Sequence, residues 1–313
     1  MSNFLRRYGI WIISVAALTF VISKLNWAAF LAQLAKVSIL DILLLVIIYL
    51  LGFFPRALRS KLMLPALSWQ AAMGGVMIGY AANNILPARL GELVRAHIIG
   101  KVEGIRTSTT LSSIVFERML DGFVIVILLF IGSTQLALPG WAEEARWTGL
   151  ALFSVALIIF LISGFFRSFC LRFVPEGRLG TFIEGVLEGA AIGCRNVPAL
   201  LSIVALSFAV WFMEAVMFRY GFAIFDLRLG YLEALFVLGV LNLGILIPNS
   251  PGNIGVFQYF TILALSVFEI DASHATAYSV VLHLCQYVSV TCIGLFYLSL
   301  FGVRSLTDLR KDV

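Results

Sequence analysis

Apolar residues run along the chain in long, nearly unbroken stretches, and six of these are long enough to cross a bilayer. A membrane-spanning helix needs about 20 mostly apolar residues, because each residue adds about 1.5 Å. The pattern therefore predicts an all-α polytopic membrane protein with about six transmembrane helices. These cover roughly residues 8–23, 39–54, 111–132, 147–166, 199–222 and 275–301.

Two further apolar stretches are interrupted by proline and glycine. One covers residues 71–100 and is broken at 87–91, and the other covers 234–268 and is broken at 248–252. Each half is too short to cross the membrane, so we expect two re-entrant broken helices that return to the side from which they entered. Irregular backbone at that depth must be surrounded by protein or by water.

Composition leaves no room for a separate soluble domain. The chain has 313 residues, of which 61% are hydrophobic and 12% charged, and its mean hydropathy is +1.02. The longest hydrophilic intervals are short, at about 133–146 and 167–196. We therefore predict a single membrane domain over residues 1–313.

The placement of arginine and lysine sets the predicted orientation. With both broken helices re-entrant, the basic residues concentrate on the side of the two termini, where Arg56, Arg59 and Lys61 fall in a loop. Basic loops face the cytoplasm. We therefore expect a bacterial inner (plasma) membrane protein with both termini cytoplasmic. The opposite loops carry only Lys24, Lys36, Arg146, Arg219 and Arg228.

The two broken stretches also resemble each other. Each has Ile-Leu or Leu-Ile before a proline that is followed four residues later by glycine, at Gly91 and Gly252. Three spans separate equivalent positions, so the halves form an inverted repeat. The predicted organisation is a first repeat half at 36–132, a cytoplasmic linker at 167–196 and a second repeat half at 198–302.

The linker carries apolar residues at helical spacing, with charged residues on the opposite face. Leu179, Ile183 and Leu187 share one side, and Arg178 and Glu184 face away from it. This is typical of an amphipathic helix. Such a helix either lies on the cytoplasmic membrane surface or packs beneath the bundle.

The first broken stretch contains the most informative polar residues, namely Asn83, Asn84, Arg89, Glu92 and Arg95. The last three are spaced three apart and share one helix face. Charges inside an apolar segment cost several kcal/mol unless they are paired or hydrated, which makes them candidates for substrate binding. The structural alternative is a Glu92 to Arg95 ion pair that closes the hairpin.

A second motif, Glu117, Arg118 and Asp121, lies early in a predicted span. The two carboxylates are four residues apart, so they share a face. Paired carboxylates can act as general acid and base, but neither a nucleophile nor a set of metal ligands accompanies them. We expect a charge network that holds Arg89 or Arg95. Positioning and proton-linked gating both remain open as its role.

The second broken stretch supplies Asn249, Ser250, Gly252, Asn253 and Gln258. Serine followed by proline predicts a helix N-cap and first position, so a half-helix should begin there. Its free N–H groups would point into the membrane interior, where they suit a phosphate or carboxylate. The alternative is a simple kink.

Other polar and reactive residues indicate little chemistry. Glu214 with Arg219, and His283 with Gln286, either line the same cavity or pair across helices. The four cysteines show no C-x-x-C spacing, and no nucleotide-binding or hydrolase motif occurs. We expect no catalytic residue, no metal, no cofactor, no nucleic-acid partner and no enzymatic activity.

Three motifs resemble the lysylphosphatidylglycerol synthase transmembrane, or flippase-like, family. They are N-x-x-P-x-R-x-G-E-x-x-R at 84–95, E-R-x-x-D at 117–121 and P-x-x-P-G-x-x-G at 248–255. The resemblance covers nearly the whole chain and implies two re-entrant elements that meet in mid-membrane. Asn253 stands where a glycine is expected and Gln258 where an acidic residue is usual. The soluble aminoacyl-transferase domain is missing, so synthase activity is not expected.

The resemblance implies a flippase that moves an anionic lipid or lipid-linked head group between leaflets. The substrate would be a phosphatidylglycerol derivative or a polyprenyl-phosphate-linked sugar. Transport would run downhill or use an ion or proton gradient, with Glu92, Glu117 and Asp121 as coupling candidates. The alternatives are an integral membrane lipid-modifying transferase and a scaffold for a lipid or glycan synthase. The partners expected are membrane lipids, a second copy of the chain, and a lipid-synthesising enzyme or glycosyltransferase.

Overall fold

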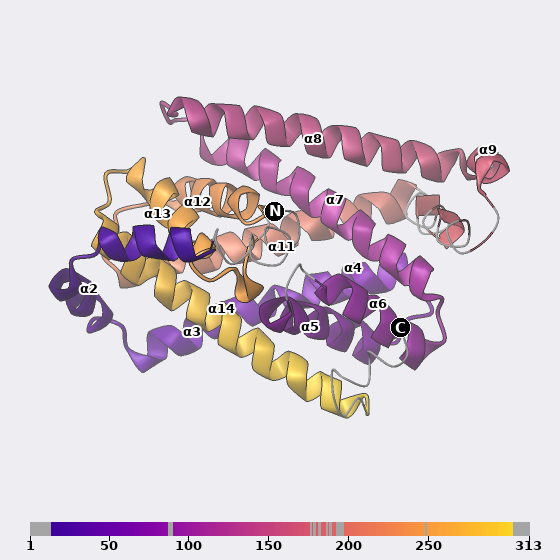
Figure 1. Ribbon diagram of the computed structural model, residues 1–313, viewed down its shortest axis with the longest axis horizontal. Coiled ribbons are helices and arrows are strands. Elements are labelled where there is room, and N and C mark those ends of the chain that lie inside the picture. The colour runs from indigo at the N-terminus through magenta and orange to yellow at the C-terminus, as the bar shows by residue number, and fades with distance from the viewer. Residues whose placement is uncertain are drawn as a thin grey trace, which may run out of the picture.

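The computed structural model describes most of the chain, and every regular element in that part is helical. This confirms the predicted all-α fold. The described residues are 14–86, 90–175, 177, 180, 183–185, 187, 190–191, 197–247 and 249–302. Figure 1 shows the elements, which are α2 (Trp27–Leu34), α3 (Ile39–Leu51), α4 (Phe53–Met63), α5 (Trp69–Ile85), α6 (Gly91–Glu103), α7 (Thr107–Gly132), α8 (Gly140–Phe165), α9 (Arg167–Cys170), η2 (Leu171–Phe173), α11 (Val197–Ile224), α12 (Tyr231–Gly244), η3 (Pro251–Asn253), α13 (Val256–Ser266) and α14 (Ala272–Leu300).

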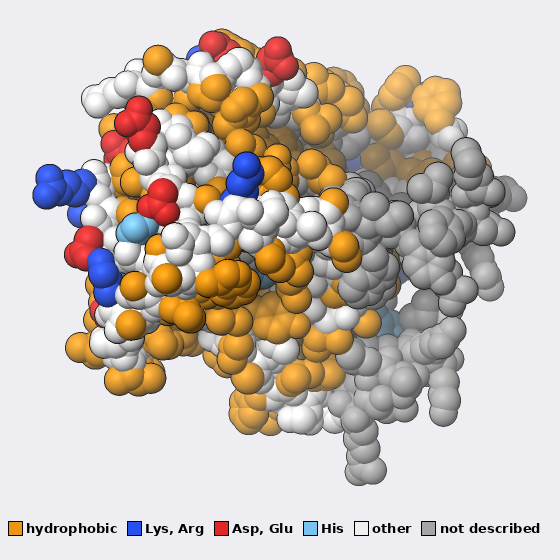
Figure 2. Space-filling view, turned by 60° about the vertical axis from the view of Figure 1, so that its left-hand side comes forward, with side chains coloured by type: hydrophobic (Ala, Val, Ile, Leu, Met, Phe, Trp, Pro, Cys, Tyr) orange, Lys and Arg blue, Asp and Glu red, His pale blue; other side chains and the backbone are white. Residues whose placement is uncertain are grey.

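Four helices in the described part are long and apolar enough to cross a membrane: α3 continued by α4, α8, α11 and α14. A fifth candidate is Ser14–Ser23 with α2, which are bent by 97° at a short break. Helix α7 has 26 residues and is also long enough, but it carries the charged Glu117, Arg118 and Asp121. The architecture is that of a polytopic membrane protein. Figure 2 shows hydrophobic side chains over much of the described surface, with most of the visible charged side chains in its left-hand half.

Helices α5 and α6 form a tight antiparallel hairpin at the first predicted break. A Cβ added to Gly75 would lie 2.6 Å from Ile99, and one added to Gly79 would lie 3.2 Å from the Cβ of Arg95. The two residues of each pair lie equally far from residue 87 in the sequence. The chain therefore reverses its direction near that residue. The turn itself, residues 87–89, lies outside the described residues.

The second predicted break also turns the chain back on itself. Helices α12 and α13 pack against each other, and a Cβ added to Gly244 would lie 2.2 Å from the ring of Phe260. The connection contains the 3-10 turn η3. Neither broken stretch is therefore a kinked continuous rod, because in such a rod the two halves would not touch.

Each hairpin packs on the last long helix of the other half of the chain. Gly294 of α14 lies against Met77 and Ala81 of α5, and Gly239 of α12 lies against Leu129 of α7. Small residues permit such close approach between membrane helices. Two similar halves would produce this reciprocal packing. The boundaries of the halves and their inversion across the membrane stay predictions.

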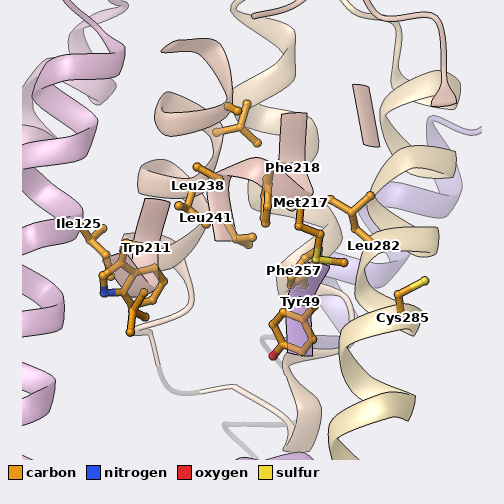
Figure 3. Packing of buried hydrophobic residues seen from close by; sticks show 14 of the residues in the cluster. Tyr49, Ile125, Trp211, Met217, Phe218, Leu238, Leu241, Phe257, Leu282 and Cys285 are labelled. Carbon is orange, nitrogen blue, oxygen red and sulfur yellow. The ribbon is translucent and has the colours of Figure 1, made fainter. Parts of the chain in front are cut away.

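A single large apolar cluster joins these elements. Figure 3 shows Tyr49, Trp211, Phe218, Leu241 and Phe257 brought together from distant parts of the sequence. Helix α8 contributes only Ala142 to the buried residues of this cluster, and it lies on the outside of the bundle along α7 (Figure 1).

The described part of the linker packs against the bundle. Leu187 and Ala190 are buried. A Cβ added to Gly164 of α8 would lie 2.7 Å from the Ala190 carbonyl oxygen. A Cβ added to Gly185 would likewise collide with the side chain of Ser108, at the start of α7. These contacts favour the helix packed beneath the bundle over one free on the membrane surface. Leu179 and Arg178 lie outside the described residues.

The first hairpin leads to a testable expectation at Gly91. A Cβ there would lie 2.0 Å from the Gly79 carbonyl oxygen, so Gly91→Ala must separate α5 from α6. We expect this overpacking to lower the free energy of unfolding by about 1–3 kcal/mol or more. Thermal denaturation of the purified protein in detergent measures the change. Gly140→Ala is the control, because a Cβ at Gly140 meets nothing within 4 Å, and equal melting temperatures for the two variants would contradict the hairpin.

Candidate functional site

A cluster of four buried charges lies between the hairpin helix α6 and the long helices α4, α7 and α11. Arg59 donates to both carboxylate oxygens of Asp121, at 2.6 and 3.2 Å, and to the Ser207 hydroxyl at 2.8 Å. The indole of Trp211 donates to the same carboxylate at 3.1 Å. Arg59 is 0% exposed. Asp121 is therefore fully engaged as the partner of a buried arginine.

Arg95 and Glu117 complete this buried charge cluster, which consists of Arg59, Arg95, Glu117 and Asp121. Arg95 donates to both oxygens of Glu117, at 2.8 and 3.0 Å, and to the Ser60 hydroxyl at 2.8 Å. Arg59 lies 3.6 Å from Glu117. Paired and hydrogen-bonded in this way, the charges are tolerated in an apolar interior.

The structure settles two expectations about the charged motifs. The network predicted around Glu117 and Asp121 does hold Arg95. The alternative ion pair between Glu92 and Arg95 does not form, since Arg95 bonds to Glu117 instead. Arg89 lies outside the described residues.

Arg56 forms a second buried pair beside the cluster. It donates to Glu214 at 2.6 Å and to the Tyr80 hydroxyl at 3.2 Å, and it lies over the rings of Phe53 and Trp211. Glu214 therefore pairs across helices, with Arg56 rather than with Arg219, and it also lines the cavity beside these charges.

The prediction that Arg56 and Arg59 lie in a cytoplasmic loop is wrong. They are 2% and 0% exposed, within a helix that continues from Ile39 to Met63. Hydropathy ends the span near residue 54 because Pro55 and charged residues follow. Partners on α7 and α11 stabilise those charges, and they are distant in sequence. The spacing of the two arginines, three apart directly after an apolar run, is the signal that could have indicated a continued helix.

A cavity of about 670 Å³ lies next to these charges. Both broken helix pairs contribute to its wall, together with α7, α8, α11 and α14. The sequence alone did not indicate Tyr49, Tyr80, Trp211 and Asn242 as members of this wall. Of the predicted site residues, the cavity is lined by Asn83, Asn84, Glu92, Arg118, Asp121, Asn249, Ser250 and Asn253.

Of the two described arginines that line the cavity, Arg118 has the fewer partners. Its side chain is 35% exposed, its contact with Asp121 is long at 3.6 Å, and no described residue bonds to its Nε. Its guanidinium lies 5.6 Å above the Tyr80 ring. Each of the three side-chain nitrogens of Arg56, in contrast, has a partner, namely Tyr80, the Gly52 carbonyl and Glu214. Arg118 is therefore the better placed of the two to accept an anion in the cavity.

The two asparagines at the end of α5 bond to α6 and to α14. Asn83 accepts from the Gly91 amide at 2.8 Å and donates to Glu92 at 3.2 Å. Asn84 donates to Thr291 of α14 at 2.9 Å. A Cβ added to Gly252 would lie 3.4 Å from the Asn84 carbonyl oxygen, so η3 lies against the end of α5 at the cavity.

The half-helix predicted to begin at Ser250 begins later. Pro251–Asn253 form only a 3-10 turn, Ser250 makes no capping bond, and α13 starts at Val256. Gly252 and Gly255 have φ of 67° and 83°, which interrupts the helix. The N-terminus is not bare either, because the Gly255 amide donates to the Gln258 side chain at 2.9 Å.

A model of the lysylphosphatidylglycerol synthase transmembrane region matches residues 8–294 of the chain. The protein belongs to this family. A UPF0104 membrane protein of Methanocaldococcus jannaschii is 27% identical over 69% of this chain and 93% of its own length. A UPF0104 membrane protein of Methanothermobacter thermautotrophicus is 23% identical over 72% and 74%.

A third relative carries the name of a glycosyltransferase. Glycosyltransferase AglD of Haloferax volcanii is 23% identical over 85% of this chain, but this chain covers only 48% of AglD. Two of these three relatives are thus named only as membrane proteins, and one is named for an enzymatic activity. No solved structure matches the chain.

Both departures from the synthase-family pattern have structural reasons. Asn253 has φ of 56°, and asparagine is the residue that replaces glycine most readily in this left-handed region. Gln258 caps Gly255 with its oxygen and contacts His283 Nδ1 with its nitrogen at 2.9 Å. The other ring nitrogen of His283 lies 2.8 Å from the Gly252 carbonyl. Gln258 thus shapes the turn and does not line the cavity, whereas His283 and Gln286 both do.

Proposed function

We propose that the protein is a translocase for an anionic lipid or lipid-linked head group. The observation that carries this proposal is Arg118, a sparsely paired arginine that lines a cavity of about 670 Å³ where two broken helices meet. An arginine in a membrane interior attracts phosphate, because its guanidinium donates in a planar fork. The amides of Asn83, Asn242 and Asn249 line the same cavity and add neutral hydrogen-bonding groups.

The buried charge cluster supports the proposal by holding the cavity wall rigid. Glu117 and Asp121 are each bonded to a buried arginine, so their role is positioning. Glu92 is the candidate for proton coupling that remains. It lines the cavity, and its Oε2 has no partner among the described residues. Transport then runs downhill or is coupled to a proton gradient through Glu92.

Leaflet exchange in proteoliposomes tests this function. Purified protein is reconstituted with fluorescent phosphatidylglycerol, and dithionite bleaches the outer-leaflet probe. We expect the bleached fraction to exceed one half with time, because the inner probe crosses to the outside. Fluorescent phosphatidylcholine, which has no net charge, serves as the selectivity control. Bleaching that stops at the protein-free level for anionic probes would contradict the proposal.

The relation to AglD favours a second candidate, a scaffold for a glycan-synthesising enzyme. AglD is a glycosyltransferase, and the region that this chain resembles is about half of it. A scaffold would keep its function when Arg118 is replaced, whereas a translocase would not. We propose no chemical step in the cavity, so a new lipid species detected by mass spectrometry would favour a transferase instead. We also propose that the protein lies in the plasma membrane with both termini in the cytoplasm.

A further inference from the structure

The cavity wall formed by α8 and the end of α12 is mostly apolar, with Asn242 as its polar member, and it reaches the outer surface. Leu152 of α8 and Leu246 just after α12 both line the cavity, and they are 60% and 47% exposed. A residue that faces both the cavity and the exterior marks the place where the cavity opens. In a membrane protein an exposed apolar edge faces lipid chains.

Helix α8 is held loosely at this edge. Only 17% of the most apolar 18-residue stretch of α8 is buried, against 28–33% for the same stretch of the other three spans. Helix α8 packs mainly on α7. It meets α12 near Gly149, where an added Cβ would lie 3.5 Å from the Leu243 side chain. Helix α8 contributes no residue to the buried charge cluster. It can therefore move away from α12 without breaking a buried ion pair.

Phe153 of α8 packs on α7 at the edge of the cavity, about one helix turn from Arg118. Its ring lies directly on Gly122 of α7, where an added Cβ would be 1.9 Å from the ring. Both residues line the cavity. Gly122 is four residues from Arg118, so the two lie on one face of α7 about one turn apart. A head group at Arg118 would therefore direct its hydrocarbon chain along Gly122 towards Phe153.

We propose that the hydrocarbon chain of the lipid passes sideways between α8 and the end of α12, through an opening that Phe153 closes. This α8–α12 portal rests on the proposed function and adds the route to it. The occupant is a hydrocarbon chain, acyl or prenyl, whose anionic head lies at Arg118. Displacement of the Phe153 ring and a small outward movement of α8 open the portal, and no charged side chain needs to cross it.

A reversible cross-link tests the portal. The four native cysteines are replaced by alanine, and Gly149→Cys with Leu243→Cys is joined by a short bis-methanethiosulfonate reagent. We expect exchange of fluorescent phosphatidylglycerol to fall to the protein-free rate and to recover after reduction. The matched control joins Gly149→Cys to Val126→Cys of α7, since a Cβ at Gly149 lies 3.0 Å from Val126. That link leaves α8 on α7, so exchange should continue.

The outcomes separate the portal from the function. Full-rate exchange in protein whose α8–α12 link is verified by mass spectrometry would overturn the portal alone. Absence of exchange by the native protein, measured first, would overturn the proposed function and the portal together.

A second measurement on the native chain needs no substitution. Phosphatidylglycerol with a photoreactive diazirine near its chain end is irradiated with the protein, and labelled peptides are mapped. Gly122 and Ile125 are buried and line the cavity, so a lipid chain reaches them only from inside it. Label on these two residues supports the portal. Label confined to exposed positions of α8 that do not line the cavity, such as Ile159 and Phe165, overturns it.

Discussion

Replacing Arg59 by alanine is expected to unfold or severely destabilise the protein. Arg59 bonds to Asp121 and Ser207 and lies 3.6 Å from Glu117, all within a buried interior. Removal of one partner leaves the carboxylate of Asp121 without its main counter-charge. Breaking a buried pair in this way costs about 3–5 kcal/mol. Thermal denaturation in detergent, with the amount of monodisperse protein recovered, measures the loss.

The control for Arg59 is an exposed ion pair in the same chain. Lys36 and Asp226 lie 2.9 Å apart, but their side chains are 43% and 76% exposed. Such pairs contribute about 0–1 kcal/mol, so Lys36→Ala should melt close to the native protein. Comparable losses for Arg59→Ala and Lys36→Ala would show that the buried charge cluster does not hold the helices together.

Replacing Arg118 by alanine is expected to slow lipid exchange about ten- to hundredfold while the fold survives. Arg118 contributes a long contact to Asp121 and lies over the Tyr80 ring, and Asp121 keeps Arg59 and Trp211 as partners. A hydrogen bond to a charged group is worth about 1.5–3 kcal/mol, which corresponds to about ten- to hundredfold weaker binding of a phosphate. Exchange in proteoliposomes and melting temperature, measured on the same preparation, separate the two effects.

Arg146→Ala is the matched control for Arg118→Ala. Arg146 lies at the start of α8, stacks over Phe130 and Trp147, and pairs with Glu143 rather than lining the cavity. The Arg146→Ala protein should exchange lipid at the native rate. Full exchange by Arg118→Ala protein, or equal loss in both variants, would remove Arg118 from the site.

Features encoded by neighbouring residues could be predicted from the sequence. The reversal near residue 87 follows from Pro87 and Gly91, because proline cannot continue a helix and glycine permits close approach. The reversal of the second stretch follows from the same chemistry. The association of Arg95 with the Glu117 motif could also be expected, since a charge in an apolar segment requires a partner.

Features that depend on distant partners could not be predicted. Hydropathy assigns Arg56 and Arg59 to a loop because it counts their charge and not Glu214 or Asp121, which neutralise that charge across the bundle. Cavity walls combine residues from many helices, so Tyr80 and Trp211 carried no local signal.

The start of α13 differs from the prediction for a local reason. Serine before proline is a strong N-cap signal, but Gly252, Asn253 and Gly255 all adopt positive φ and postpone the helix to Val256. The sequence Gly-Asn-x-Gly after the proline carries this information, because glycine and asparagine favour the left-handed region.

The central claim is that an anionic lipid head group rests in the cavity against Arg118. The most direct test is the lipid content of protein purified in mild detergent, identified by mass spectrometry after organic extraction. We expect the native protein and Arg146→Ala to retain a phosphate-bearing lipid, and Arg118→Ala to lose it. Equal retention of the same lipid by native and Arg118→Ala protein, or no anionic lipid on the native protein, would contradict the account.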